Sequence, residues 1–292
     1  MSNLPTISVI TPSFNQGQFL SRTLASVRVQ TIPALEHLIF DGGSQDDSLT
    51  ILQSCRDTVQ WVSQSDDGQG DAVNQGIKKA QGEIIGWLNS DDLYYPKTLE
   101  AVSRFFQSHP DVDLMYGQAD HIDINDQPFE AYPTQDWDPK CLRQICFLCQ
   151  PAVFFRKRVV DRIGLLDPSL RYCMDYNYWL RLSDAGCRFH HVKIKLAGSR
   201  LYSENKTLGN RVAVHQEIAK MFLQLDGNVP IRWVMAYATH YVEQYYNREL
   251  HPGHFALHRL IKALRQQLTW NHSLGMIDYL RMKRLLASQA SR

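Results

Sequence analysis

Polar and acidic residues able to serve a metal or phosphate site gather in four short segments of this 292-residue chain. Each segment follows an apolar, β-branched run; the four are Thr11–Asn15, Asp41–Ser44, Asp66–Asp67 and Asn89–Asp92. Crowded carboxylates repel one another and raise each other's pKa. A hard divalent cation shared with a substrate diphosphate offsets that repulsion. Aspartate is also common in turns and helix caps, which explains any single segment but poorly explains the set.

The runs before these segments predict the strands that position them. They are Thr6–Thr11, His37–Phe40, Gln60–Ser63 and Glu83–Leu88. Apolar residues at helical spacing lie between them, as from Phe19 to Val27 and from Asp71 to Ala80. Strands that alternate with helices predict βαβ units and a parallel sheet. Ligands of such open sheets bind outside the carboxyl ends of the strands, so we expect the four polar segments to meet at one edge.

The second half of the chain predicts shorter strands and then helices alone. Strand-like runs cover residues 113–117, 129–132 and 152–155, and a helix is expected over 175–185. From Val212 onward the apolar spacing is helical. We therefore predict an α/β fold with a Rossmann-like, mainly parallel sheet flanked by helices, followed by a C-terminal helical appendix.

Composition excludes several classes of protein. The chain is 44% hydrophobic and 21% charged, as in an ordinary globular protein. A net charge of +1 argues against a nucleic-acid footprint over the whole molecule. Residues 1–208 carry 20 basic and 25 acidic residues, whereas residues 231–292 carry 9 and 3. The sequence thus predicts an acidic body with a basic tail.

The N-terminal sequence, the longest apolar runs and the six cysteines bear on localisation and thiol chemistry. No secretory signal and no apolar run of 18 residues is visible, so we expect a cytoplasmic protein with reduced thiols. Cys141, Cys146 and Cys149 have spacing compatible with zinc. A second short Cys/His hook is missing, and buried thiols are the better interpretation.

A dinucleotide site is the competing interpretation of one motif. Gly68-Gln-Gly70-Asp-Ala-Val73 nearly matches the glycine-rich fingerprint, and Asp91 follows Gly70 by 21 residues. Val73 replaces the third small residue of the fingerprint. Asp66, with its acidic neighbours, would place negative charge beside a pyrophosphate. Both details disfavour this interpretation.

Five segments, taken in order and spacing, resemble family 2 glycosyltransferases of the GT-A fold over about residues 4–207. They are Ile7–Asn15 (ISVITPSFN), Phe40–Asp47 (FDGGSQDD), Asp66–Gly76 (DDGQGDAVNQG), Trp87–Tyr94 (WLNSDDLY) and Tyr172–Arg181 (YCMDYNYWLR). The resemblance implies transfer of a sugar from a nucleoside diphosphate donor to an acceptor hydroxyl. It also implies Mn²⁺ or Mg²⁺ as cofactor and inversion of the anomeric centre.

The resemblance also implies roles for individual residues. The nucleotide-binding residues would be Thr11, Pro12, Asn15, Asp41, Asp66, Asn89, Ser90 and Asp91. Asp91 would also bind the metal, and Asp175 would be the general base. The residues on the donor-sugar and acceptor side would be Asp71, Asp92, Gln150 and Trp179. Arg200 and Lys206 are candidates to offset diphosphate charge, with solvated surface as the alternative; for Asp175 the alternative is a carboxylate that stabilises a helix N-terminus.

Three positions depart from the family pattern. Asn89 replaces the first Asp of the D-x-D motif, Met174 replaces the Glu before the base, and Tyr202 stands where many relatives have a His near the metal. Neighbouring His190 and His191 could compensate for that lost His. Two hypotheses therefore remain: an inverting hexosyl- or N-acetylhexosaminyl-transferase, and a catalytically silent protein that binds sugar nucleotides.

We expect a glycosyltransferase domain over residues 1–208 and a helical extension over 209–292. The donor would be a UDP-sugar, by family majority, and the acceptor a glycan, a lipid-linked glycan or a polysaccharide precursor. Basic residues accompany aromatic residues and leucines in the extension; the basic ones are Arg259, Lys262, Arg265, Arg281, Lys283 and Arg284. Such helices either pack on the body or rest on anionic lipid at the inner face of the membrane.

Overall fold

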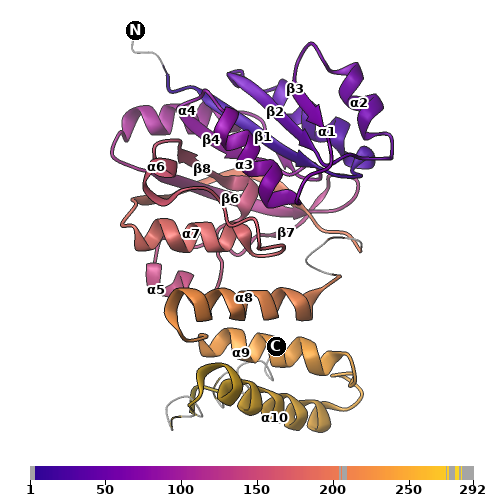
Figure 1. Cartoon of the computed structure of the whole chain (residues 1–292), viewed down its shortest axis with the longest axis vertical. Coiled ribbons are helices and arrows are strands. Elements are labelled where there is room, and N and C mark those ends of the chain that lie inside the picture. The colour runs from indigo at the N-terminus through magenta and orange to yellow at the C-terminus, as the bar shows by residue number, and fades with distance from the viewer. Residues whose placement is uncertain are drawn as a thin grey trace. The chain divides into compact units, whose positions relative to one another are not determined.

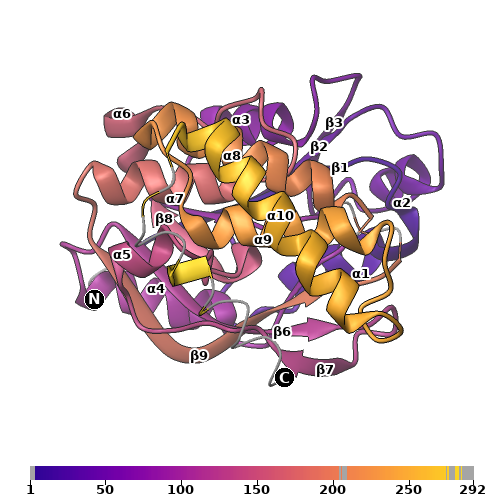
Figure 2. The same ribbon diagram turned by 90° about the horizontal axis from the view of Figure 1, so that it is seen from below.

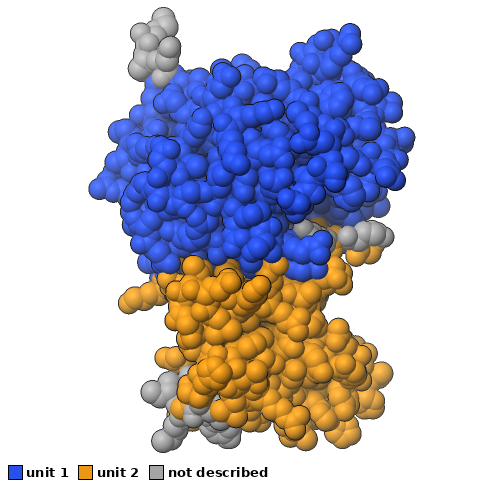
Figure 3. All heavy atoms as spheres, viewed as in Figure 1, with its two compact units in different colours: residues 1–139, 146–202 blue, residues 140–145, 203–292 orange. Residues whose placement is uncertain are grey.

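The computed structural model describes residues 4–203, 205, 209–273, 275, 280–282 and 284. The chain forms two compact units, residues 1–139 with 146–202 and residues 140–145 with 203–292 (Figure 3). The break in contacts thus follows Tyr202, six residues before the boundary expected from the sequence. Lys206, expected near the diphosphate, lies outside the described residues.

The first unit begins with a parallel half-sheet (Figure 1). Its strands, in the spatial order β3-β2-β1-β4, are β1 (Ile7–Ser13), β2 (Glu36–Asp41), β3 (Gln60–Ser63) and β4 (Ile84–Trp87). The helices between them are α1 (Gly17–Arg28), α2 (Ser48–Ser54) and α3 (Gln69–Lys79). These elements confirm the predicted βαβ units. Every residue of β1, β2 and β4 is buried, as expected for continuous apolar strands covered on both faces.

The sheet continues beyond β4 with strands of mixed direction. These strands are β5 (Leu93–Tyr94), β6 (Leu114–Ile122), β7 (Pro128–Ala131), β8 (Val153–Arg156) and β9 (Phe189–Arg200). Their spatial order is β8-β6-β9-β5, and β7 pairs with β6. β8 is antiparallel to both β4 and β6, whereas β6 and β9 are parallel. The predicted parallel arrangement therefore holds for the first four strands, and the antiparallel pairing of β8 makes the sheet mixed. The shorter strands expected in the second half are contradicted by β6 and β9, which have 9 and 12 residues.

Helices complete the first unit around this sheet. They are α4 (Thr98–Ser108), α6 (Val159–Ile163), α7 (Met174–Asp184) and the 3₁₀ turn η1 (Gln150–Ala152). The large core cluster combines residues of β1, β4, α4, β6, η1, β8 and β9, among them Val9, Leu99 and Phe154.

The second unit is helical, as predicted. It contains all but the first residue of the short α5 (Pro139–Leu142). The longer helices of this unit are α8 (Arg211–Asp226), α9 (Ile231–Glu243) and α10 (Pro252–Asn271). α9 contacts both α8 and α10 and lies between them (Figure 1). No helix among the described residues is long and apolar enough to cross a membrane.

The close approach of α3 to β1 depends on a glycine. A Cβ on Gly76 would lie 2.3 Å from Cγ2 of Ile10, which is completely buried in β1. Cores are packed too densely for such a group to be absorbed without movement of the backbone. The helix that carries Asp71 at its start is therefore held at its far end by this contact.

Gly76→Ala should destabilise the first unit by about 1–3 kcal/mol, the usual cost of overpacking a core. Gly70→Ala in the same helix is the matched control, because its Cβ would lie 3.5 Å from the nearest atom, Pro168 Cα. That change should be neutral or stabilise by up to about 1 kcal/mol, since alanine is the better helix former. Urea unfolding of both variants measures the difference; equal midpoints would contradict the packing constraint.

Candidate active site

The carboxyl ends of the parallel strands meet at one edge of the sheet, as predicted. In register, Ser13 at the end of β1 pairs with Asp41 at the end of β2, and Asp41 pairs with Ser63 at the end of β3. Backbone hydrogen bonds continue past these ends, with Gly42 donating to the Ser13 carbonyl and Gln64 to the Asp41 carbonyl. We call this edge, with the loops that follow β1 to β4, the carboxyl rim.

Asp41 is the fixed centre of the second loop. Its side chain is buried and accepts hydrogen bonds from the backbone of Gly43 and Ser44, at 3.2 and 2.9 Å. The hydroxyls of Ser44 and Ser63 donate to the same carboxylate at 2.5 and 2.7 Å. Four hydrogen-bond donors hold this carboxylate in place. Asp41, which the sequence analysis expects at the nucleotide, therefore fixes the shape of the second loop.

Asn15 ties the first loop to the second. It has a positive φ of 51°, its Oδ1 accepts from the backbone of Gln45 at 2.9 Å, and its own N–H donates to the Ser44 hydroxyl at 2.7 Å. Thr11 is buried in β1, and its hydroxyl lies 2.9 Å from Nε2 of His37. Burial lowers the pKa of His37 to about 3, so this imidazole stays neutral. Of the expected first-loop residues, Asn15 is exposed at the rim, whereas Thr11 and Pro12 are buried.

Acidic residues of the third loop approach the second loop closely. Burial raises the pKa of Asp66, and the charges of Asp71, Asp41 and Asp67 raise it further against the opposing hydrogen bond from Gly68. A Cβ on Gly42 would lie 3.2 Å from the Asp66 carboxylate oxygens. The absence of a side chain at residue 42 thus leaves room for Asp66 over the second loop. The structure brings these carboxylates together, as expected.

Asn89 is a junction of side-chain hydrogen bonds. Its Oδ1 accepts from Gln69 Nε2 and from Trp87 Nε1, each at 2.8 Å. Its Nδ2 donates to Gln150 Oε1 at 2.9 Å and to Asp92 Oδ2 at 3.3 Å. The sequence singled out Asn89 and Gln150 but missed Gln69 and Trp87. Gln69 lies inside the glycine-rich motif Gly68–Val73. Its polar side chain between two glycines was the sequence feature that could have identified it as a site residue.

Asp91 faces Tyr202. The Tyr202 hydroxyl donates to Asp91 Oδ2 at 3.1 Å and accepts from Gln16 Nε2 at 3.1 Å. Burial and the neighbouring Asp91 carboxylate raise the pKa of Tyr202, so the phenol keeps its proton and acts as the donor. Burial also raises the pKa of Asp91, opposed by hydrogen bonds that include the one from Tyr202. The tyrosine that departs from the family pattern is therefore in direct contact with the expected metal ligand.

Arg200 has partners other than the expected diphosphate. Its guanidinium donates to the Asp91 carbonyl at 2.7 Å, to the Asp123 carbonyl at 2.5 Å and to Asp126 Oδ1 at 2.5 Å. It stacks over the ring of Phe19, with 4.5 Å between guanidinium carbon and ring centroid, and its side chain is fully buried. Arg200 thus braces the fourth loop from inside the protein.

Asp92 is the buried partner of that brace. Its Oδ1 accepts from the Arg200 backbone at 2.8 Å. Burial, followed by the charge of Asp91, places the pKa of Asp92 well above its usual range. Ser90 is buried beside it, and the Ser90 and Asp92 carbonyls both accept from the Thr23 hydroxyl, at 2.9 and 2.7 Å. Asp92 therefore fixes the loop backbone and does not face open solvent.

Asp175 stands in the first turn of α7. It is partly buried, and its Oδ1 accepts from the backbone of Tyr176 at 2.7 Å. Burial raises the pKa of Asp175 to about 6 against the opposing backbone hydrogen bonds. Burial raises the pKa of the Cys149 thiol most, and the charges of Asp92 and then Asp175 raise it further.

The start of α7 also lies against the start of α3. A Cβ on Gly70 would lie 3.6 Å from the Sδ of Met174, the residue just before Asp175. Trp179, one turn further along α7, is buried with its ring against those of Phe155 and Tyr178. Trp179, expected to contact the sugar, thus lies among buried aromatic side chains of the core.

The histidines that could have replaced the lost metal-side His have other neighbours. His190 packs on the rings of Phe105 and His109, and His191 stacks on Tyr116 with its Nδ1 2.7 Å from Asp136. Among the described residues, no group of three or more His, Cys, Asp or Glu side chains could hold a metal ion.

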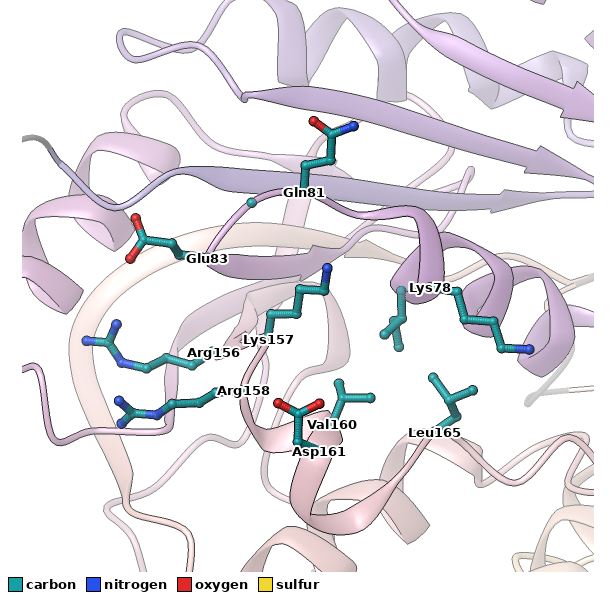
Figure 4. A pocket seen from close by; sticks show the side chains of 11 residues that line it. Lys78, Gln81, Glu83, Arg156, Lys157, Arg158, Val160, Asp161 and Leu165 are labelled. Atoms are coloured by element: carbon teal, nitrogen blue, oxygen red, sulfur yellow. The ribbon is translucent and has the colours of Figure 1, made fainter.

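A cleft of about 580 Å³ lies elsewhere on the first unit (Figure 4). Its lining includes Lys78 at the end of α3, Gly82 and Glu83 just before β4, and Lys157 after β8. The rim residues lie at the opposite ends of α3 and β4. This cleft is therefore separate from the carboxyl rim.

Comparisons with known proteins identify the family. The model of glycosyl transferase family 2 matches residues 8–164, more than half of the chain. An uncharacterized glycosyltransferase of Rickettsia typhi is 28% identical over 218 residues, which cover 70% of this chain and 66% of that protein. One from Nostoc sp. is 28% identical over 234 residues, covering 73% of this chain and 70% of that protein. The chain belongs to glycosyltransferase family 2.

Two solved structures share the fold. S. aureus TarS 1-349 in complex with UDP-GlcNAc superimposes with a TM-score of 0.62 at 16% identity, covering 88% of this chain and 79% of that one. The mannosyltransferase PcManGT from Pyrobaculum calidifontis, in complex with GDP-Man and Mn²⁺, gives 0.61 at 16% identity, covering 99% and 81%. The expected GT-A fold is confirmed.

Arg200→Met should destabilise the first unit by about 2–4 kcal/mol, because it leaves two partly buried carbonyls without their donor and removes the buried partner of Asp126. Arg22→Met is the matched control, since Arg22 binds the same Asp126 carboxylate at 2.9 Å but from a side chain that is 35% exposed. It should cost about 1 kcal/mol or less. Urea unfolding separates the two, and equal losses would contradict the bracing role of Arg200.

Proposed function

We propose that the chain transfers a hexosyl or N-acetylhexosaminyl group, with inversion, from a UDP-sugar to a hydroxyl of a glycan, a lipid-linked glycan or a polysaccharide precursor. One observation carries the proposal: the glycosyl transferase family 2 model matches residues 8–164, and the polar ends of the parallel strands in that range meet at the carboxyl rim. Such a rim is where an open parallel sheet binds its ligand. The fold neighbours are complexes with UDP-GlcNAc and GDP-Man, both nucleoside diphosphate sugars.

Asp175 would act as the general base. With its pKa raised to about 6 by burial, it is mostly ionised at neutral pH yet is a stronger base than an ordinary aspartate. As the acceptor oxygen bonds to the anomeric carbon, the hydroxyl proton passes to Asp175 and the diphosphate leaves from the opposite face. Met174 is buried in the place of the family's glutamate, and it adds apolar surroundings to the base without a second negative charge.

The carboxyl rim would hold the donor. Exposed Asn15, buried Asp41 and half-buried Asp66 surround the second loop and are our candidates for the nucleotide. Asp71 is partly exposed at the start of α3 and is a candidate contact for the donor sugar. Arg200 supports the rim by fixing the fourth loop, and diphosphate charge would have to be offset by other groups.

The residues present fit a divalent metal held chiefly by the donor. Asp91 is the one carboxylate of the fourth loop that is partly exposed, because Asp92 is buried against Arg200 and the amide of Asn89 is fully engaged. Mg²⁺ and similar cations are commonly bound by one carboxylate together with substrate phosphates and water. Asp91 would hold Mn²⁺ or Mg²⁺ in this way. The bound metal would stabilise the charge that develops on the departing diphosphate.

Asp175→Asn should lower kcat by about 10²–10⁴-fold, the usual contribution of a general base. Wild-type kcat should fall about tenfold per pH unit below a pKa of about 6, since only the ionised carboxylate accepts a proton, and this limb should vanish in the variant. Asp184→Asn, at the exposed far end of α7, is the control and should keep wild-type activity.

The same variant offers a stability readout. The folded pKa of Asp175 lies above its unfolded value of 3.8, so ionisation costs stability as pH rises from about 4 to 6, and the cost persists above that. Asp175→Asn should therefore be at least as stable as wild type at pH 7. A variant less stable than wild type at pH 7 would contradict the raised pKa of Asp175, whereas near-wild-type turnover would place the base elsewhere.

Tyr202→His should tighten the binding of Mn²⁺ in the presence of UDP by roughly tenfold, because imidazole is a good ligand and a protonated phenol is a poor one. Tyr202→Phe is the control, which removes the hydrogen bond to Asp91 without adding a ligand. Calorimetric titration of Mn²⁺ into protein and UDP compares the three. If histidine does not raise the affinity for Mn²⁺, or if phenylalanine raises it equally, residue 202 does not lie at the metal position.

A catalytically silent protein that binds sugar nucleotides is the second candidate, favoured by the engaged amide of Asn89. Incubation with UDP-GlcNAc, UDP-glucose or GDP-mannose and Mn²⁺ distinguishes the two. Release of nucleoside diphosphate, dependent on an acceptor glycan and with an inverted product by NMR, supports the enzyme. Donor binding without release supports the silent protein.

A further inference from the structure

Helix α10 carries apolar residues on its outer side. Its side toward α9 includes Phe255, Arg259, Ala263 and Gln267, all buried and spaced four residues apart. On the opposite side, Leu257 is 54% exposed, Ile261 37% and Leu268 51%. At 100° per residue, these three and the half-buried Leu264 fall within one narrow stripe. We call this stripe the outer face of α10; Figure 2 looks onto this helix.

This distribution reverses the usual amphipathic pattern. Single exposed leucines are normal on a protein surface, but a helix normally buries its aliphatic residues and exposes its arginines. Here Arg259 is 4% exposed and Gln267 3%, while the leucines face out. Arg259 is one of the basic residues of the predicted extension, and the structure buries it. The outer face is thus a contiguous apolar surface, whereas the buried side of the same helix includes the polar residues Arg259 and Gln267.

Exposed basic residues occur on α10 and elsewhere in the second unit. Arg265 lies on the flank of the outer face, and Arg248, Arg281 and Arg284 are exposed before and after this helix in the sequence. Residues 244–292 together contain eight Lys or Arg and two Asp or Glu. An apolar stripe within a strongly positive region matches the surface of an anionic bilayer, which offers acyl chains beside negative headgroups.

We propose that the outer face of α10 rests on an anionic lipid surface, with Leu257, Ile261 and Leu268 entering the headgroup boundary. A second copy of the chain fits less well. A symmetric pairing would bring the flanking arginines of both copies together, and a stable interface needs more than one narrow stripe. The proposal stands on the residues of α10 and does not depend on the donor, acceptor or base proposed above.

Flotation of the full chain with lipid vesicles tests the proposal. Binding to vesicles of phosphatidylcholine with 30% phosphatidylglycerol should exceed binding to phosphatidylcholine alone, and 0.5 M NaCl should weaken it. The triple variant Leu257→Gln, Ile261→Gln, Leu268→Gln should bind at least about tenfold more weakly. Arg265→Gln with Arg284→Gln should weaken binding about tenfold on the anionic vesicles.

The matched control replaces exposed aliphatic residues of the first unit: Val29→Gln, Leu35→Gln, Ile194→Gln. It should bind vesicles as wild type does, and circular dichroism should show all variants folded. Wild-type binding by the α10 variant, or no preference of the wild type for anionic vesicles, would overturn the proposal. A dimer in sedimentation that dissociates only in the α10 variant would assign the face to self-association and overturn it too. Donor turnover, measured separately, reports on the proposed function alone.

Discussion

Four parallel strands place several carboxylates at one edge of the sheet, where they repel one another. The hydrogen bonds that stabilise these carboxylates determine the structure of the rim. Asp41 is held by four hydrogen-bond donors, two of them from its own loop backbone. Asp92 accepts from the Arg200 backbone, and Asp91 from Tyr202. Asp66 accepts a hydrogen bond from the Gly68 backbone, and burial together with nearby carboxylates raises its pKa. A cationic or metal-bound ligand would therefore gain most near Asp66 and Asp91.

Arg200 links this electrostatic arrangement to the fold. Because its guanidinium is buried, its charge acts in a region of low dielectric and stabilises the fourth loop more than a surface arginine could. The same side chain connects that loop to the turn at Asp126 and to Phe19 of α1. Arg200 thus holds the fourth-loop backbone in place, and Asp175 is the candidate site residue whose protonation changes near neutral pH.

Much of the fold could be predicted from the sequence because β-branched runs that end in polar segments specify parallel strands and their common edge. The positions of Asp41, Asp66 and Asp91 followed from backbone topology alone. The placement of Arg200 and Trp179 did not, because a long side chain at the end of a strand or on a helix can point to either side, and tertiary packing decides which. The reversed pattern of α10 was equally hidden, since leucines at helical spacing indicate a buried face in most helices.

The central claim is that the nucleoside diphosphate binds at the carboxyl rim, next to Asp91. A crystal structure of the protein grown with UDP and Mn²⁺, with anomalous data at the manganese edge, tests it most directly. We predict one manganese peak bonded to the Asp91 carboxylate and to the UDP phosphates, with the uracil beside Asn15 and Asp41. UDP in the separate cleft near Lys78 and Lys157, or manganese away from Asp91, would contradict the account.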